Sequence, residues 1–246
     1  AQILGGTSTT YMSIESTGTV TLQGGTAFNS QAEICGGFNN PNLTMNLTGG
    51  TSDLLITSGD TDPSLPYAGI TQFNNVNISV ARNITLTGSP NANAGTALIY
   101  SNALLTISSG LDTKIDANVG QAFIQSGTGG ANITSGNDFT INAGSNGATA
   151  YLWSGAGVQP LVMNITNDLN IEGGTGVGPS DAYISNFGNA NITVGGILKI
   201  QASPATSDGK AYLYLNSLAA PLTTNQTRIL GGTTAGNAAY AELFIT

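Results

Sequence analysis

The stretch "AYLWSG" at residues 150–155 returns as "AYISNF" at residues 182–187 and as "AYLYLN" at residues 211–216. Each copy places a small, an aromatic and an aliphatic residue in the same order. The shorter pattern Ala-x-Ile/Leu occurs in one phase nine times, with a mean spacing of 30 residues (240 residues over eight intervals). The alanines are Ala1, Ala32, Ala68, Ala97, Ala122, Ala150, Ala182, Ala211 and Ala241. A sustained period of this length is typical of a repeat protein.

Two more apolar columns follow the same period, and we call the alanine pattern the third column. The first column contains Ile14, Leu47, Ile78, Ile107, Ile133, Ile165, Ile192 and Leu222. The second column contains Leu22, Ile56, Leu86, Ile115, Ile141, Ile171, Ile200 and Leu230. Around each column apolar and polar residues alternate, as in "FTIN" at residues 139–142. This alternation predicts a strand with one buried and one solvated face.

Three strands in every period predict a parallel β-helix, in which each column becomes one parallel sheet and turns stack about 4.8 Å apart. A β-sandwich also has alternating strands, but it has no reason to repeat three distinguishable columns at one period. We therefore expect an all-β, single-stranded parallel β-helix of about eight turns, forming one domain over residues 1–246. Crossovers between parallel strands are overwhelmingly right-handed, which predicts a right-handed coil.

Composition argues against helices and against several classes of partner. Only 7% of the residues are charged, compared with roughly 25% in typical soluble domains, and the abundant Gly, Asn, Ser and Thr weaken helices. The net charge of -8, with five basic residues, opposes attraction to nucleic acid or to an anionic membrane surface. No apolar run is long enough to span a bilayer. We expect neither nucleic-acid binding nor membrane insertion.

The chain contains no histidine, which removes the commonest general base, the Ser-His-Asp triad and the usual zinc ligand. The candidate carboxylates are Asp53, Asp60 and Asp62 around "GDTDP" at residues 59–63, Asp112 and Asp116 beside one strand, and Asp138 and Asp168 in successive turns. Such groups can bind calcium or sugar, but Asp also favours turns for local hydrogen bonding. We expect turn residues, no enzymatic activity and no cofactor.

Eight Asn-x-Ser/Thr sequons also recur, at Asn42, Asn46, Asn77, Asn83, Asn132, Asn164, Asn191 and Asn225. In a eukaryotic secreted protein these would be glycan acceptors. The alternative is structural, because Asn and Thr beside an inward Ile point outward and can align into hydrogen-bonded ladders. The single cysteine, Cys35, excludes an internal disulfide; it either cross-links copies from an outward column or lies buried under a loop.

Aromatic residues gather in the outward positions of the third column. We predict a contact face for a partner, a glycan or another copy of the chain. Its residues are Tyr100, Phe123, Tyr151, Trp153, Tyr183, Tyr212, Tyr214 and Phe244. The alternative is that the rings stack along the sheet or are covered by loops.

The phrases "DFTINAG" (residues 138–144), "AYISN" (residues 182–186) and the repeated "NIT" and "LTG" resemble bacterial extracellular β-strand-repeat proteins. This class includes filamentous-haemagglutinin-like adhesins and autotransporter passengers. The resemblance covers essentially the whole chain and carries no active-site motif. It implies a parallel β-helix that serves as a secreted or cell-surface structural or adhesive rod.

The first and last residues lie at the same phase of the repeat, with no polar cap in the sequence. Unpaired strand edges at solenoid ends drive association, so we expect self-association into a fibre, with end contacts at Ile3, Leu4, Leu243 and Phe244. The alternatives are an adhesin or glycan-binding segment of a longer surface protein and, third, a polysaccharide lyase or hydrolase. The expected location is secreted or cell-surface, and the expected partners are further copies or a host or surface glycan.

Overall fold

The computed structural model describes residues 1–5, 11–25, 31–37, 40–59, 67–91, 95–155, 159–175, 178–203, 208–232 and 239–246. Within these ranges every regular element is a β-strand, which confirms the all-β prediction. No helix among the described residues is long and apolar enough to cross a membrane. The candidate carboxylates Asp60 and Asp62 lie outside the described residues.

The strands form three parallel faces, one for each column of the sequence. The first face contains β2 (Tyr11–Ser16), β5 (Asn42–Leu47), β8 (Val76–Val80), β11 (Leu105–Ser109), β14 (Ala131–Ser135) and β17 (Leu161–Ile165). The second face contains β3 (Val20–Gln23), β6 (Leu54–Thr57), β9 (Ile84–Thr87), β12 (Thr113–Asp116), β15 (Phe139–Asn142), β18 (Leu169–Glu172) and β21 (Thr223–Leu230). The third face contains β1 (Gln2–Leu4), β4 (Ala32–Cys35), β7 (Tyr67–Phe73), β10 (Thr96–Ser101), β13 (Gln121–Ser126), β16 (Thr149–Ser154), β20 (Ala211–Leu218) and β22 (Ala241–Ile245). The long strand β19 (Asp181–Gln201) passes through all three faces.

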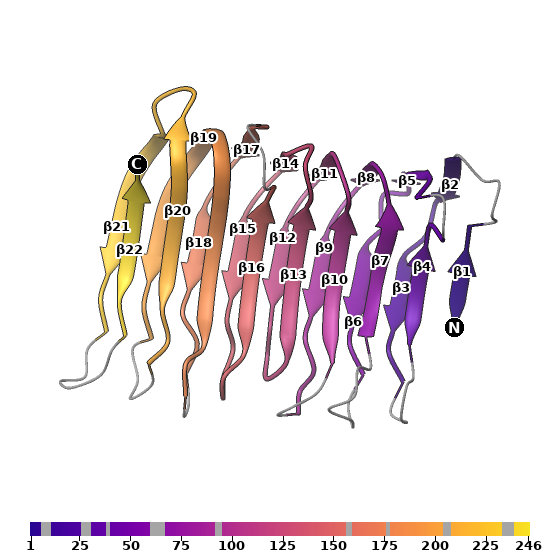
Figure 1. Ribbon diagram of the computed structural model, residues 1–246, viewed down its shortest axis with the longest axis horizontal. Coiled ribbons are helices and arrows are strands. Elements are labelled where there is room, and N and C mark those ends of the chain that lie inside the picture. The colour runs from indigo at the N-terminus through magenta and orange to yellow at the C-terminus, as the bar shows by residue number, and fades with distance from the viewer. Residues whose placement is uncertain are drawn as a thin grey trace.

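Each strand pairs in parallel with its equivalent in the next turn, as β10 does with β7 and β13. Figure 1 shows the result, an elongated solenoid with its two termini at opposite ends. The third-face strands rise at the front and the second-face strands descend behind them as the chain advances, which is a right-handed coil. About seven turns are complete, close to the expected eight.

Strand pairing confirms the third column, because each alanine from Ala32 to Ala241 is paired with the next and Ile3 is paired with Ile34 in the first turn. The other two columns need three corrections. The residues in register are Met45 instead of Leu47, Met163 instead of Ile165, and Ile229 instead of Leu230. Leu47 and Ile165 lie two positions further along the same strands and also face the core. A shift of two residues preserves the inward face, so alternation alone could not find it.

The core is a continuous aliphatic stack along the axis of the solenoid. Ile78, Ile107 and Ile133 are paired in successive layers and are at most 1% exposed. Each buried aliphatic side chain contributes about 2 kcal/mol of gross hydrophobic stabilisation. The solenoid is therefore held together by packing and by parallel backbone pairing.

Buried serines mark the corner between the third and first faces. Ser101, Ser126 and Ser154 are in register in three successive turns and fully buried. The Ser101 hydroxyl lies 2.8 Å from the carbonyl oxygen of Asn74 and 2.9 Å from that of Leu104. Both carbonyls also accept a backbone N–H, from Ala103 and Val76, so it is the buried hydroxyl that these turn carbonyls satisfy.

Candidate functional site

The predicted aromatic face contains one uninterrupted stack of rings, which we call the aromatic ladder: Phe123, Tyr151, Tyr183 and Tyr212. These residues come from β13, β16, β19 and β20 and are paired in register. Successive ring centroids lie 4.7, 5.0 and 4.8 Å apart, and the ring planes are within 6° of parallel. The spacing is that of the strands, so each ring lies over the ring of the next turn.

The other four predicted aromatic residues form a broken column. Gln125 separates Tyr100 from Trp153, and Ser185 separates Trp153 from Tyr214. Phe187, which the sequence analysis missed, fills the second gap. Its ring lies 6.2 Å from that of Trp153, edge to face, and 6.0 Å from that of Tyr214. Tyr214 in turn stacks on Phe244 at 5.2 Å.

Phe187 was missed because it lies two positions beyond the two outward columns that the sequence analysis followed. The pairing of β19 with β20 is interrupted between Asn186 and Asn189, although inward and outward residues go on alternating, with Asn186 buried and Phe187 exposed. The signal in the sequence was the aromatic residue two positions after the serine gap in "AYISNF".

The ladder tyrosines are half-buried. Burial raises the pKa of Tyr151, Tyr183 and Tyr212 above the usual value for tyrosine, and neighbouring Tyr183 or Asp181 adds to the effect. Because the ring faces cover one another, the interior rings of the ladder offer edges, not faces, to any ligand. Sugar recognition by an aromatic ring uses its face, so this geometry favours the stacking alternative for the ladder.

The predicted end contacts lie in the outermost layers. Ile3 is 52% exposed, Leu4 60% and Phe244 40%, whereas Leu243 packs partly against the core. Two residues that the sequence analysis did not assign as end contacts, Ile229 and Ile245, are also exposed in the last layers.

Most of the candidate carboxylates form a ladder of their own at the turn before the second face. The polar turn ladder consists of Asp53, Asn83, Asp112, Asp138 and Asp168. The Oδ1 atom of each member accepts the backbone N–H of the next, with N···O distances between 3.0 and 3.2 Å, and Asp168 accepts that of Ile197 at 2.7 Å. The prediction of turn residues is confirmed for these four aspartates, whereas Asp116 is the last residue of strand β12.

The described residues contain no group of three or more His, Cys, Asp or Glu side chains that is placed to hold a metal ion. Asp116 is the remaining described carboxylate of the predicted set. Its Oδ2 atom lies 2.7 Å from Nζ of Lys114, and its Oδ1 atom accepts the backbone N–H of Asn118 at 3.0 Å. Both oxygens thus have protein partners.

Cys35 is buried, as one of the two alternatives predicted. Its Sγ atom lies 3.1 Å from Oε1 of Gln72, and burial raises the pKa of the thiol. The adjacent carboxylate of Glu33 is 4% exposed and accepts hydrogen bonds from Thr71 and Gln2. A buried thiol with a raised pKa is a poor nucleophile.

The sequon residues point outward, as expected, since Asn164 is exposed beside the buried Ile165. The expected ladder along the first face is interrupted, because Thr106 stands between Asn77 and Asn132 in register. Sequon asparagines instead bond at the turns. Asn42 accepts hydrogen bonds from both the side chain and the backbone of Asn75, and Asn83 belongs to the polar turn ladder.

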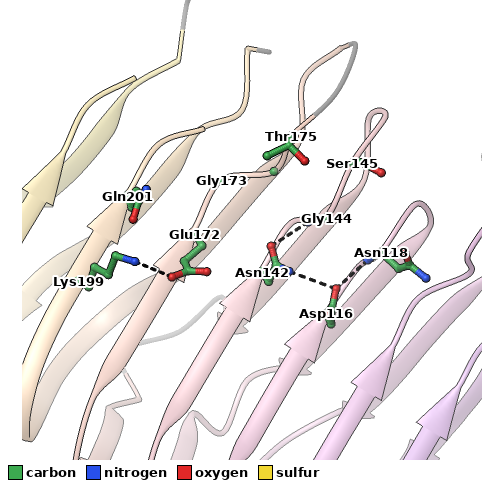
Figure 2. Close-up of a pocket in the computed structure, with 11 residues that line it drawn as sticks. Asp116, Asn118, Asn142, Gly144, Ser145, Glu172, Gly173, Thr175, Lys199 and Gln201 are labelled. Atoms are coloured by element: carbon green, nitrogen blue, oxygen red, sulfur yellow. Dashed lines mark hydrogen bonds and ion pairs between the residues drawn. The ribbon is translucent and has the colours of Figure 1, made fainter. Parts of the chain in front are cut away.

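A polar groove of about 500 Å³ lies where the second-face strands end and turn toward the third face. Figure 2 shows four side chains pointing to it from successive layers: Asp116 from β12, Asn142 from β15, Glu172 from β18 and Gln201 from β19. The other lining residues are Asn118, Gly144, Ser145, Gly173, Gly174, Thr175 and Lys199.

The floor of the groove depends on a repeated turn. Oδ1 of Asp116 accepts the backbone N–H of Asn118, and Oδ1 of Asn142 accepts that of Gly144 at 3.1 Å. Asn118 and Gly144 both have positive φ, 57° and 76°. A Cβ atom on Gly144 would lie 2.0 Å from the carbonyl oxygen of Asn118. The absence of this side chain lets the layers stack closely and leaves the groove open.

The outward position of the four groove side chains follows from the sequence period, but the groove itself does not. It depends on the path of the turns after the strands, which the alternation of residues does not encode. Comparison of the chain with protein-family models, with curated proteins and with solved structures found no match.

Proposed function

We propose that this β-solenoid is a non-enzymatic structural subunit of an extracellular or cell-surface fibre, and that copies associate end to end through their open strand edges. The proposal rests on the positions of the exposed large apolar side chains, which gather at the two ends of the solenoid. Eight of the eleven described ones belong to the outermost layers: Ile3, Leu4, Tyr11, Ile229, Leu230, Tyr240, Phe244 and Ile245.

The strands of these layers are paired on one side only. Among the described strands, β1 pairs with β4 and β22 with β20. An edge of this kind offers unpaired backbone N–H and C=O groups beside apolar side chains, and it is extended by whatever strand reaches it. Such an edge can be covered by a further turn of the same chain or by a second copy. Only a second copy makes the purified chain form filaments.

The non-enzymatic role is supported by the use of the polar side chains. The polar turn ladder, the corner serine Ser101 and the paired carboxylates of the groove all bond within the solenoid. A catalytic pair of carboxylates needs one free acid and one free base or nucleophile.

Electron microscopy of the purified chain across a concentration series tests the fibre. We expect filaments whose axial repeat matches one subunit, roughly 40 Å from the stacking of the turns. The substitution Ile245→Lys places a charge in the last layer and is expected to abolish filaments. Ser79→Lys, on an exposed position of the central strand β8, adds the same charge away from both ends and should leave filaments intact.

A wild-type chain that stays monomeric at every concentration contradicts the proposal. Filaments that survive Ile245→Lys but not Ser79→Lys would show lateral instead of end-to-end association.

A second candidate function is that of a glycan-binding rod segment of a longer surface protein. The polar groove favours it, since the groove opens on the side of the solenoid and is independent of the ends.

A further inference from the structure

The polar groove has unused hydrogen-bonding capacity. Within the described part of the chain, no protein group bonds the side-chain amides of Asn118 and Gln201 or the hydroxyls of Ser145 and Thr175. These are donors and acceptors of the kind that recognise hydroxyl groups. A ligand that fits them must itself be rich in hydroxyls or amides.

The charges around the groove favour a neutral ligand. Glu172 is paired with Lys199, with Oε1 and Nζ 2.8 Å apart, and Asp116 is paired with Lys114 at 2.7 Å. The two carboxylates and two ammonium groups sum to zero, in a protein whose net charge is -8. The net negative charge of the protein therefore repels an acidic glycan at long range, and the described residues of the groove include no unpaired cation to compensate. A cationic ligand is not favoured either, because both carboxylates of the groove are already paired with lysines.

The groove runs along the axis of the solenoid. Its four side chains lie one per layer along the solenoid axis, from Asp116 to Gln201 (Figure 2). Layers repeat about every 4.8 Å, which is close to the length of one pyranose residue in an extended glycan. Three such steps accommodate about three sugar residues.

We propose that the polar groove binds a neutral oligosaccharide that lies along the solenoid axis, with one sugar residue for each step between neighbouring layers. Gln201 and Thr175 hydrogen-bond its hydroxyls, and the Lys199–Glu172 pair supplies a donor and an acceptor together. The proposal rests on the second candidate function and uses none of the end contacts of the fibre, so either one can fail without the other.

Isothermal titration calorimetry of the full chain tests the groove. The probes are the neutral trisaccharides maltotriose, cellotriose and mannotriose, with trigalacturonate as the acidic comparison. We expect at least one neutral trisaccharide to bind and trigalacturonate to bind about tenfold more weakly or not at all. The double variant Gln201→Ala/Thr175→Ala should lower the association constant about tenfold, because it removes two hydrogen-bonding groups.

The matched control is Thr87→Ala. Thr87 pairs with Asp116 in the same outward column, one layer before the groove, so its substitution should change the association constant less than about twofold. The proposal is overturned if no neutral trisaccharide binds at concentrations up to about 10 mM, if the double variant binds as well as wild type, or if trigalacturonate binds most tightly. Repeating the titration with Ile245→Lys shows whether binding depends on assembly, and we expect the same affinity.

Discussion

At the scale of the residue, the polar turn ladder shows how one side chain can serve two layers. Oδ1 of Asp112 accepts the backbone N–H of Asp138 at 3.1 Å and the side-chain amide of Asn137 at 2.7 Å. The chain turns sharply here, and the N–H would otherwise lack a strand partner. A short acceptor at the same place in each turn supplies one.

The substitution Asp112→Ala should therefore destabilise the solenoid by about 2 kcal/mol, since it leaves half-buried donors without an acceptor. Asp112→Asn is the matched control, because Asn83 already fills the same role one turn earlier. It should cost less than about half as much. Urea unfolding of the two variants measures the difference, and equal losses would show that the charge, not the accepted hydrogen bond, matters.

The identity of single residues determines which features of the fold the sequence predicts. The alanines of the third column could be found because Ala-x-Ile/Leu keeps one period of about 30 residues; the pattern alone does not suffice, since it also occurs out of phase at Ala103 and Ala131. Leu47 and Ile165 were assigned to the first column in place of Met45 and Met163, since all four side chains face the core and the period of a strand does not distinguish them. The aromatic ladder could be predicted for the same reason as the alanines. Phe187 lies beyond the two outward columns that repeat, where the pairing with β20 is interrupted, and the groove depends on the path of the turns.

At the scale of the element, the aromatic ladder joins four strands on the third face. Each stacked pair of rings contributes about 1 kcal/mol beyond its buried area. Phe123 holds one position of the ladder without a hydroxyl, so stacking does not require tyrosine. The hydroxyls have a separate effect, on the response to pH.

Stability should fall above about pH 10, the usual pKa of tyrosine. The folded-state pKa of Tyr151 and Tyr212 is raised because burial disfavours the phenolate. Above pH 10 the unfolded chain loses these protons while the folded chain keeps them, so alkali favours unfolding, and the stabilisation is lost as the pH rises toward the folded-state pKa.

The variant Tyr151→Phe keeps the ring and removes one of these ionising groups. Urea midpoints measured between pH 8 and about pH 11 should decline less steeply than in wild type, with little difference at neutral pH. A steeper decline, or no change in slope, would contradict the assignment of the raised pKa to burial in the ladder.

At the scale of the whole molecule, every turn packs mainly against the two turns beside it. Stability in such a protein is a sum of turns and their interfaces, and the outermost turns have one neighbour instead of two. The burial of the layers follows this order, since Ile14 and Leu22 in the first turn are half-buried whereas Ile107 and Ile115 in the middle are buried.

Amide hydrogen exchange should reflect this gradient. We expect the slowest exchange in β11 to β16 and faster exchange toward β1 and β22 in monomeric protein. In filaments the end layers should become as protected as the middle if copies associate end to end. End layers that exchange equally fast in both states would place the contact elsewhere.

The stacking direction has one further consequence. Backbone hydrogen bonds between turns run along the rod, and the termini lie at its two ends (Figure 1). A pulling force applied between the termini would load those bonds lengthwise, opening one layer at a time instead of shearing many at once. Each released turn of about 30 residues would add about 100 Å of extended chain. Under tension such a rod would lengthen turn by turn and absorb mechanical work, so a fibre of rods joined end to end would be extensible instead of stiff.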